Sequence, residues 1–171
     1  MDMNQVKIIE KAFNKQEAKI IQAEIRKSPD ITGYSLRELL GFKNIFKAYK
    51  NQEFAGACIN FDFGESWTEL SGFIVLPKFR GRGIGRLLYK SAFADAENRK
   101  RNIYVVSRNP AMQRIIRKSD LKIISDFRRL PQVIRLHSLS FIVSWYRLIE
   151  AIRKAFMKKS GKFIYGIRLT A

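Results

Sequence analysis

Apolar residues recur along the chain at two spacings, one typical of helices and the other typical of strands. Residues 15–27 place their apolar side chains on one helical face. Asn14 stands before them as an N-cap, with Glu17 three residues later, which is the sequence of a capping box. The other helices expected from this spacing cover residues 35–40, 84–98 and 110–118.

Short apolar runs bounded by turn residues predict the strands. They cover residues 6–9, 45–49, 54–61, 66–76, 103–106, 121–124 and 162–169. Within residues 45–76 the runs are separated only by short turns, at 50–53 and around 62–64, which favours an antiparallel meander. The alternation of these strands with helices predicts an α/β fold around one mixed sheet.

Length and composition indicate a single domain spanning residues 1–171. Hydrophobic residues make up 46% of the chain and aromatic residues 12%, which suffices for one real core. Cys58 and His137 are each the only residue of their type. A disulfide framework, a zinc cluster and Cys–His catalysis are therefore not expected. Cys58 lies in an apolar run and is expected to be a buried small side chain.

The first residues lack the basic and apolar regions of a signal peptide. No run of about twenty apolar residues occurs, because the longest candidate, 130–149, is interrupted by arginines and a histidine. We therefore expect a cytoplasmic protein.

The stretch from Phe73 to Leu88 joins a strand to a helix through a glycine-rich turn. The apolar run stops at Pro77, and the glycines at 81, 83 and 85 alternate with other residues before the helix. Glycine permits a sharp turn and close approach of the backbone. The first turn of the helix presents unpaired N–H groups and the positive end of its dipole. The pattern predicts a phosphate or pyrophosphate site, with an ordinary basic βα turn as the alternative.

The turn carries the motif R-x-x-G-x-G at Arg80, Gly83 and Gly85. Arg86 stands where a dinucleotide fingerprint needs its third glycine, and no P-loop sequence is present. The motif resembles the CoA-binding signature of the GNAT superfamily of acyl-CoA-dependent N-acyltransferases. The element order β, α, α, β, β, β, α, β, α, β is also that of the GNAT fold, whose central sheet is mixed, mostly antiparallel and flanked by helices.

The resemblance implies acetyl-CoA, or a related acyl-CoA, as cosubstrate and implies no metal. In this family the strand before the turn holds the pantetheine arm, and the amides of the turn hold the pyrophosphate. The cofactor-binding residues implied here are Val75, Leu76, Arg80, Gly81, Arg82, Gly83, Ile84, Gly85 and Arg86.

A second GNAT region, after the fifth strand, is matched only in part. Asn109 stands where many members have an asparagine, and it is implied to border the CoA. The tyrosine position seven residues later holds Ile116, and Asp120-Leu121 replace Gly-Phe. In many relatives that tyrosine protonates the departing thiolate. Either another group or water does so here, or the protein has lost activity.

Glu69 is the candidate catalytic base. An alkyl ammonium becomes a nucleophile only after it loses a proton, which a carboxylate in a partly apolar cleft can accept. Glu69 lies eleven residues before Arg80, and several GNAT members use a strand glutamate at this spacing. By strand alternation it shares a face with Ser71 and Phe73. The alternative is a solvated carboxylate on the strand surface.

Residues 127–160 depart from the plain family plan as a helical insertion before the final strand. Pro131 suits a first helical turn, and an amphipathic helix with a wide apolar face is expected over residues 130–158. Three kinds of surface could bury that apolar face. They are its own domain or a second subunit, a membrane surface with basic residues near the headgroups, and an apolar acceptor or acyl pocket.

The formal net charge of +18 is unevenly distributed. Residues 1–77 contain ten Lys/Arg and ten Asp/Glu, whereas residues 78–171 contain twenty-three and five. The phosphates of CoA account for only part of this excess. RNA, an anionic membrane surface and an acidic protein are the partner classes that fit it, and a merely basic soluble surface is the alternative.

The sequence thus predicts a GNAT-like N-acetyltransferase that transfers an acetyl group to an amine by direct attack in a ternary complex. Its acceptor is not identified, and a homodimer or peripheral membrane association is compatible with the helical insertion. Two alternatives stay open. One is a non-catalytic CoA-binding or interaction module that uses its basic surface. The other is a GNAT-type enzyme acting on aminoacyl-tRNA, positioned through the RNA phosphates.

Overall fold

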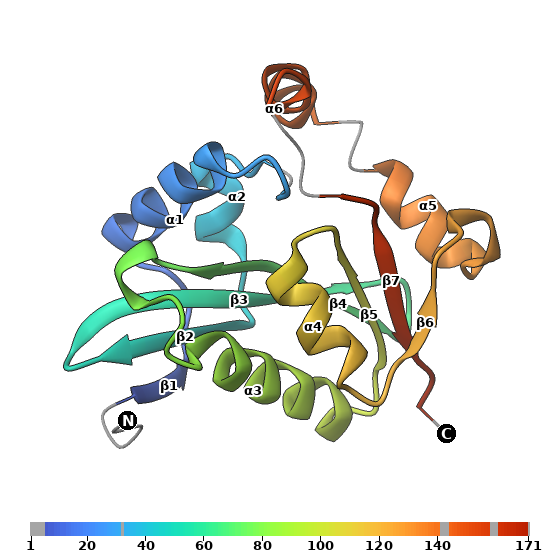
Figure 1. Cartoon of the computed structure of the whole chain (residues 1–171), viewed down its shortest axis with the longest axis horizontal. Coiled ribbons are helices and arrows are strands. Elements are labelled where there is room, and N and C mark those ends of the chain that lie inside the picture. The colour runs from blue at the N-terminus through green and yellow to red at the C-terminus, as the bar shows by residue number, and fades with distance from the viewer. Residues whose placement is uncertain (1–5, 32, 141–143, 158–160, 171) are drawn as a thin grey trace.

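The computed structural model describes residues 6–31, 33–140, 144–157 and 161–170, in which one sheet carries helices on both faces (Figure 1). The described helices are α1 (Lys15–Lys27), α2 (Leu36–Gly41), α3 (Ile84–Asn98), α4 (Pro110–Arg117), α5 (Gln132–Ser140) and α6 (Trp145–Ala155). The described strands are β1 (Val6–Glu10), β2 (Ile45–Lys50), β3 (Glu53–Phe63), β4 (Trp67–Val75), β5 (Asn102–Ser107), β6 (Lys122–Ile124) and β7 (Ile164–Arg168). Short 3-10 turns follow β4 at Pro77–Phe79 and precede α5 at Phe127–Arg129.

Local sequence signals place most of these elements where they were expected. The capping box at α1 is confirmed, because the Asn14 side chain accepts the Glu17 N–H at 2.8 Å and the Glu17 carboxylate accepts the Asn14 N–H at 3.0 Å. The long helix expected over 130–158 is wrong, since α5 ends at Ser140 and α6 begins at Trp145 after extended backbone at Ser144. Residues 141–143 and 158 of that prediction lie outside the described residues.

The sheet opens between two neighbouring strands. Its order over the described residues is β1-β2-β3-β4-β5-β7-β6, and every neighbouring pair is antiparallel except β4 and β5. This parallel pair is short and ends at Glu69 opposite Tyr104. Beyond that point β4 continues to Val75 and β5 to Ser107 without further described pairing. The two strands therefore diverge and leave a gap in the sheet.

A bulge in β4 lies at the start of this divergence. Ile59 of β3 pairs with Ser71, whereas Ala57 pairs with Ile74, so β4 uses one residue more than β3 between the two pairs. Gly72 in the bulge has φ +57°, and a Cβ there would lie 2.6 Å from the Ile59 Cδ1 atom. Both the backbone and the packing therefore require glycine at this position.

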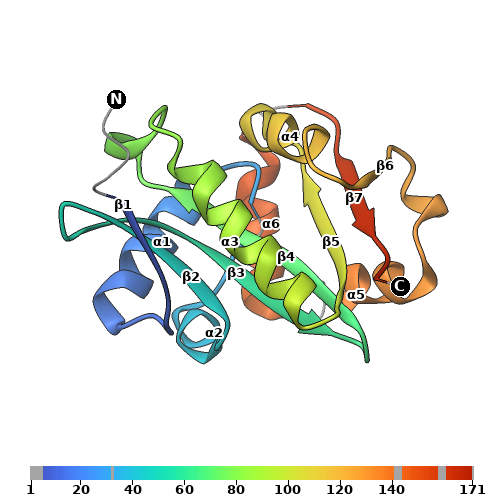
Figure 2. The same ribbon diagram turned by 90° about the horizontal axis from the view of Figure 1, so that it is seen from below.

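Helices cover the two faces of the sheet in separate groups. Figures 1 and 2 show α3 and α4 on one face, with α1, α2 and α5 on the other. The fully buried aliphatic residues Leu88 and Ile116 belong to the core under α3 and α4, Ile21 and Leu39 to the core under α1 and α2, and Ile134 to the core under α5. None of the helices in the described ranges has the length and apolar character needed to cross a membrane.

A buried charged cluster attaches α1 to the sheet. The Glu17 carboxylate accepts hydrogen bonds from Lys47 Nζ at 2.8 Å and from the Tyr49 hydroxyl. Burial by itself would raise the pKa of Glu17, but the bonds from Lys47, Tyr49 and the Asn14 backbone outweigh it and lower that pKa. Burial and then the bond to Glu17 raise the pKa of Tyr49 to about 12. The cluster therefore holds Glu17 ionised and Tyr49 protonated at neutral pH.

Candidate functional site

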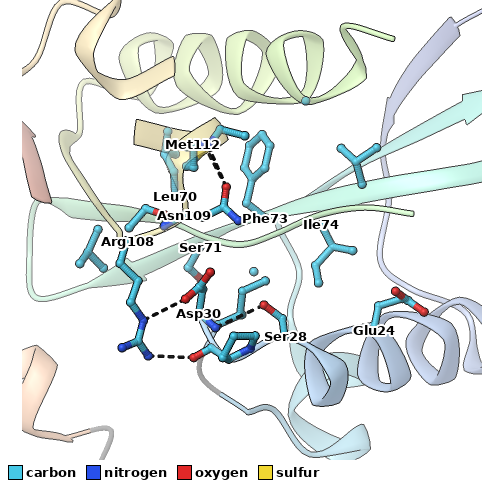
Figure 3. Close-up of a pocket in the computed structure, with 18 of the residues that line it drawn as sticks. Glu24, Ser28, Asp30, Leu70, Ser71, Phe73, Ile74, Arg108, Asn109 and Met112 are labelled. Carbon is cyan, nitrogen blue, oxygen red and sulfur yellow. Dashed lines mark hydrogen bonds and ion pairs between the residues drawn. The ribbon is translucent and has the colours of Figure 1, made fainter. Parts of the chain in front are cut away.

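The gap between β4 and β5 holds a cleft of about 840 Å³. It is lined by β4 from Glu69 to Val75, by the glycine-rich turn as far as Gly85, and by the end of β5. The loop after α1, α4 and α6 complete the lining. Figure 3 shows Ser71, Phe73 and Ile74 of β4 between Asn109 and Met112 above and Ser28 and Asp30 below. Segments far apart in the sequence thus converge on one cavity.

The glycine-rich turn has the backbone of an anion site. Gly81 and Gly83 have φ values of +75° and +78°, a region that disfavours side chains. Gly83 is the N-cap of α3 and forms no side-chain capping bond, so the first-turn N–H groups are not covered by a cap. Arg80 donates from Nε to the Val75 carbonyl at 3.0 Å and fixes the turn to the strand end. This arrangement suits a phosphate at the start of α3.

Gly85 differs from the other two glycines of the turn. It lies in the first turn of α3 with helical backbone, and a Cβ there would lie 3.6 Å from Phe73 and Val75, an ordinary contact. The backbone therefore requires glycine at Gly81 and Gly83 but tolerates alanine at Gly85.

Most of the cofactor-binding residues implied by the motif meet at the cleft. Those that line it are Val75, Arg80, Gly81, Gly83, Ile84, Gly85 and Asn109. Leu76, Arg82 and Arg86 are outside the lining. Leu76 donates its backbone N–H to the Ala55 carbonyl at 2.9 Å, so its amide is already engaged in the sheet. Arg82 and Arg86 are exposed beside the turn and add positive charge there.

Asn109 borders the cleft but also has a structural role. Its side-chain oxygen accepts the N–H groups of Ala111 at 3.0 Å and Met112 at 3.3 Å, which makes it the N-cap of α4 (Figure 3). Ile116 stands at the position where many family members have a tyrosine. Ile116 is fully buried in the core and packs over Gly166 of β7, so its position does not face the cleft. The α4 residues that line the cleft are Ala111, Met112 and Ile115.

Glu69 is buried in the cleft and pairs with the only histidine of the chain. Its side-chain Oε2 lies 2.7 Å from His137 Nε2, and the two residues are 6% and 9% exposed. His137 comes from α5 and stacks on Phe63 at a centroid distance of 3.8 Å and on Phe61 at 5.4 Å. Glu69 is therefore not a solvated surface carboxylate. Sequence spacing missed His137, because nothing local relates it to a residue 68 positions earlier.

Two tyrosine hydroxyls lie near this carboxylate. The Tyr34 hydroxyl lies 3.2 Å from the Ser71 hydroxyl, and both residues line the cleft beside Glu69. Burial and then the charge of Glu69 raise the pKa of Tyr34 and also that of Tyr104 on β5. Both hydroxyls therefore stay protonated at neutral pH and can act as hydrogen-bond donors.

One ion pair and one hydrogen bond bridge the cleft from the end of β5 to the loop after α1. Arg108 Nε lies 3.2 Å from Asp30 Oδ1, and its guanidinium donates to the Pro29 carbonyl at 2.8 Å (Figure 3). The same guanidinium stacks over Phe163 at 4.8 Å. This bridge connects the two sides of the sheet opening at the end of β5.

Helix α6 holds the same loop through its polar side chains. Lys154 donates from Nζ to the carbonyls of Ile25 and Ile31, each at 2.7 Å, and burial lowers the pKa of Lys154 to about 8. Glu150 packs so closely on Gly33 that a Cβ on that glycine would lie 2.6 Å away. The helix is thus attached by charged residues, which the amphipathic pattern alone did not indicate.

Comparison with known proteins identifies the sequence family. The family model described as "Acetyltransferase (GNAT) family" matches residues 17–119, more than half of the chain. That range contains the glycine-rich turn and Glu69. No curated protein matches the sequence.

Solved structures show the same fold at low sequence identity. N-acetylglutamate synthase from Neisseria gonorrhoeae, complexed with coenzyme A and N-acetyl-glutamate, aligns with a TM-score of 0.67, 13% identity and 95% of this chain, but only 35% of its own. Rv2747 from Mycobacterium tuberculosis, in complex with CoA, aligns with a TM-score of 0.68 and 11% identity. The alignment covers 95% of this chain and 99% of the Rv2747 chain. A GNAT family acetyltransferase from Elizabethkingia anophelis with acetyl-CoA bound aligns with a TM-score of 0.63 and 13% identity. The alignment covers 98% of this chain and 99% of the Elizabethkingia chain. The chain spans about a third of the length of the N-acetylglutamate synthase chain.

Proposed function

Because the chain belongs to the GNAT acetyltransferase family, we propose that it transfers an acetyl group from acetyl-CoA to an amine by direct attack in a ternary complex. One observation carries the proposal. A single cleft contains both the glycine-rich turn at the start of α3 and the buried carboxylate of Glu69. A phosphate site and a proton acceptor in one cavity are the two elements that acetyl transfer from CoA to an ammonium requires.

The proposed cofactor site follows the wall of the cleft from β4 to α3. Val75 contacts the pantetheine arm, and the turn from Arg80 to Gly85 holds the pyrophosphate through its N–H groups. Leu76 lies outside the lining and fixes the strand end through its bond to Ala55. The exposed guanidinium groups of Arg82 and Arg86 supply charge for the CoA phosphates. Asn109 sets the start of α4 beside the arm.

The proposed chemistry begins with a proton transfer to Glu69. Its carboxylate takes one proton from the acceptor ammonium, and the amine lone pair then forms a C–N bond with the thioester carbonyl. A backbone N–H of β4 polarises that carbonyl. The C–S bond breaks, the thiolate leaves with the electron pair, and the second nitrogen proton reaches the thiolate through water. Glu69 then releases its proton to solvent.

The charges around the cleft favour a small polar amine as the acceptor. The side of the cleft away from the glycine-rich turn is lined by carboxylates and by cations, namely Glu24, Asp30 and Glu69 and Lys27, Arg108, Arg147 and Lys154. The Arg108–Asp30 bridge and α6 narrow this side. A small amine that also carries polar groups matches such a surface better than a bulky aminoacyl-RNA does.

Binding and turnover are tested separately. Calorimetry measures the Kd of acetyl-CoA, and a thiol reagent measures CoA release with a panel of amino acids, polyamines and aminoacyl-RNA. Glu69→Gln should leave the Kd unchanged and lower kcat/KM by about a hundredfold or more. Glu65→Gln, an exposed carboxylate in the preceding turn, is the matched control and should behave as wild type.

The results distinguish this function from its alternatives. If acetyl-CoA binds but none of these amines releases CoA, the chain acts as a non-catalytic CoA-binding module. Turnover on aminoacyl-RNA alone, with binding that weakens steeply as salt increases, would support the RNA enzyme instead. Absence of acetyl-CoA binding would refute both the enzyme and the module.

A further inference from the structure

His137 is placed to control the carboxylate of Glu69. An ionised carboxylate only accepts hydrogen bonds, so the imidazole Nε2–H is the donor across the 2.7 Å contact. The ring planes of His137 and Phe63 differ by only 9°, and those of His137 and Phe61 by 17°. The imidazole is thus stacked on two flat apolar rings while its Nε2 contacts Glu69.

This contact has two consequences for Glu69. A buried carboxylate is costly to keep ionised unless it is hydrogen-bonded, and His137 supplies such a bond. The bond occupies Oε2 and therefore leaves Oε1 as the oxygen that can approach a substrate in the cleft. Because His137 lies on the inserted helix α5, the insertion contributes directly to the site.

We propose that His137 is the positioning residue of the catalytic base: its hydrogen bond fixes the Glu69 carboxylate and leaves the other carboxylate oxygen for the acceptor ammonium. This inference rests on the proposed acetyl transfer. The bond has to survive substrate binding for His137 to act in this way.

Two substitutions separate hydrogen bonding from packing. His137→Phe keeps an aromatic ring between Phe61 and Phe63 but has no donor. His137→Gln loses the ring but carries an amide N–H that can replace the Nε2–H. We expect His137→Phe to lower kcat by at least about tenfold with an unchanged Kd for acetyl-CoA, and to shift the acidic limb of the pH–rate profile. His137→Gln should recover most of the wild-type kcat and most of the wild-type pH–rate profile. In a Glu69→Gln background, His137→Phe should add little further loss.

The outcomes are distinguishable. If the wild-type protein releases no CoA with any amine, both the function and this inference fail. If the wild type is active and His137→Phe retains its kcat and pH profile, this inference alone fails. Since the chain has one histidine, a downfield imidazole N–H signal in the NMR spectrum reports the bond without turnover. That signal should be absent from both His137 variants and should move in Glu69→Gln. An unchanged signal in Glu69→Gln would also overturn the inference.

Helix α6 carries a polar stripe on one side and an apolar stripe on the other. The polar residues that contact the rest of the protein are Tyr146, Arg147, Glu150, Arg153 and Lys154. The apolar residues on the other side, all exposed, are Trp145, Leu148, Ile149, Ile152 and Phe156. Trp145 is 75% exposed and Phe156 89%. Figure 1 shows α6 at the outer edge of the molecule, on the side away from α3. The helix is therefore docked by its polar face and presents its apolar face outward.

Charge indicates what covers this face. A second copy would match the apolar stripe but would bring together two chains of net charge +18. RNA would match the charge but not the apolar side chains. An anionic bilayer matches both. At the end of α1, where Arg153 of α6 donates to the Arg26 carbonyl, the exposed cations Arg26 and Lys27 pair with Glu150 and Glu24. The positive charge that attracts the bilayer is therefore that of the chain as a whole.

We propose that the outer stripe of α6 binds the surface of an anionic membrane, with Trp145 and Phe156 entering the headgroup region. The binding needs no bilayer-spanning segment, because the helix lies in the plane of the interface. It also goes beyond the acetyl transfer and does not depend on it.

Trp145 provides a direct test. The other tryptophan, Trp67, is buried, so a blue shift of emission on adding vesicles reports Trp145. We expect cosedimentation and a blue shift with phosphatidylglycerol/phosphatidylcholine vesicles and neither with phosphatidylcholine alone. The double substitution Ile152→Glu with Phe156→Glu should weaken binding at least about tenfold. Leu136→Glu, an exposed leucine on α5, is the matched control and should have little effect.

Three results would overturn the membrane proposal. The first is no cosedimentation at low salt. The second is cosedimentation without a blue shift and unaffected by the double substitution, which indicates charge attraction alone. The third is a dimer in light scattering that the double substitution dissociates, which assigns the stripe to a second copy.

Discussion

Replacing Gly83 by alanine tests whether the turn is built as the structure indicates. Gly83 has φ +78° at the N-cap of α3, a conformation that costs a residue with a Cβ roughly 1–2 kcal/mol. Gly85→Ala is the matched variant two residues later. Its backbone is helical and its Cβ would make ordinary contacts at 3.6 Å, so alanine should stabilise by about 0.5–1 kcal/mol. The motif has glycine at both positions, but the structure predicts that alanine destabilises the protein at Gly83 and stabilises it at Gly85.

Thermal unfolding measures this difference. For a domain of this size, about 1 kcal/mol moves Tm by roughly 2–4 °C. Gly83→Ala should therefore lower Tm by roughly 2–8 °C, while Gly85→Ala raises it by roughly 1–4 °C. Urea titrations of the two variants give the free energies directly, provided that their slopes equal that of wild type.

The same variants report on the proposed CoA site. Saturating CoA, at about 100 times Kd, should add about 2.7 kcal/mol to the stability of wild type. Gly83 is the N-cap of α3, where the proposed site would hold the pyrophosphate, so strain of the turn in Gly83→Ala should shrink this gain and raise Kd about tenfold or more. The reasoning is refuted if Gly83→Ala is as stable as wild type, or if the two alanine variants shift Tm in the same direction.

Three further predictions concern residues outside the turn. Glu17→Gln leaves the buried Lys47 without its partner and should lower the free energy of unfolding near pH 7 by about 3–5 kcal/mol. Because folding lowers the pKa of Glu17 from 4.5, this contribution is present above that pH and lost below it, so urea titrations of the two proteins should converge in acid. Burial lowers the pKa of Lys154 in the folded protein to about 8, against 10.5 for a lysine in the unfolded chain. The unfolded chain then holds the extra proton between these values, so stability should rise with pH from about 8 upward, and Lys154→Met should lack that rise in the same assay. Ile116→Tyr, which restores the family's tyrosine in sequence, should overpack the core by about 1–3 kcal/mol without raising kcat; faster acetyl transfer would contradict the orientation of α4.

The sequence predicted the parts of the fold that local chemistry controls. Helix α1 follows from the apolar spacing and from the capping box at Asn14, because both act within one or two turns. The glycine-rich turn was recognisable for the same reason, since Gly81 and Gly83 impose a backbone conformation on their immediate neighbours. The family model, residues 17–119, covers the turn and α1 from Glu17 onward.

The surroundings of the candidate base could not be predicted from spacing. Glu69 was recognisable from its distance to Arg80, but its burial depends on where β4 and β5 part. His137 looked like an isolated residue, and only the packing of α5 against the sheet brings it to Glu69. Ile116 was matched to the family's tyrosine by counting from Asn109, and only the structure shows that its side chain is buried in the core.

The sequence by itself therefore determined the family, the order of the elements, and the turn that starts α3. The tertiary structure alone decided which side chains meet in the cleft and which face of α6 contacts the protein. The physical reason is the separation along the sequence over which each kind of interaction acts. Caps, turns and apolar periodicity act between residues close in sequence, whereas the contact between Glu69 and His137 joins positions 68 residues apart. The contacts of Lys154 with Ile25 and Ile31 join positions 129 and 123 residues apart, and no local pattern records them.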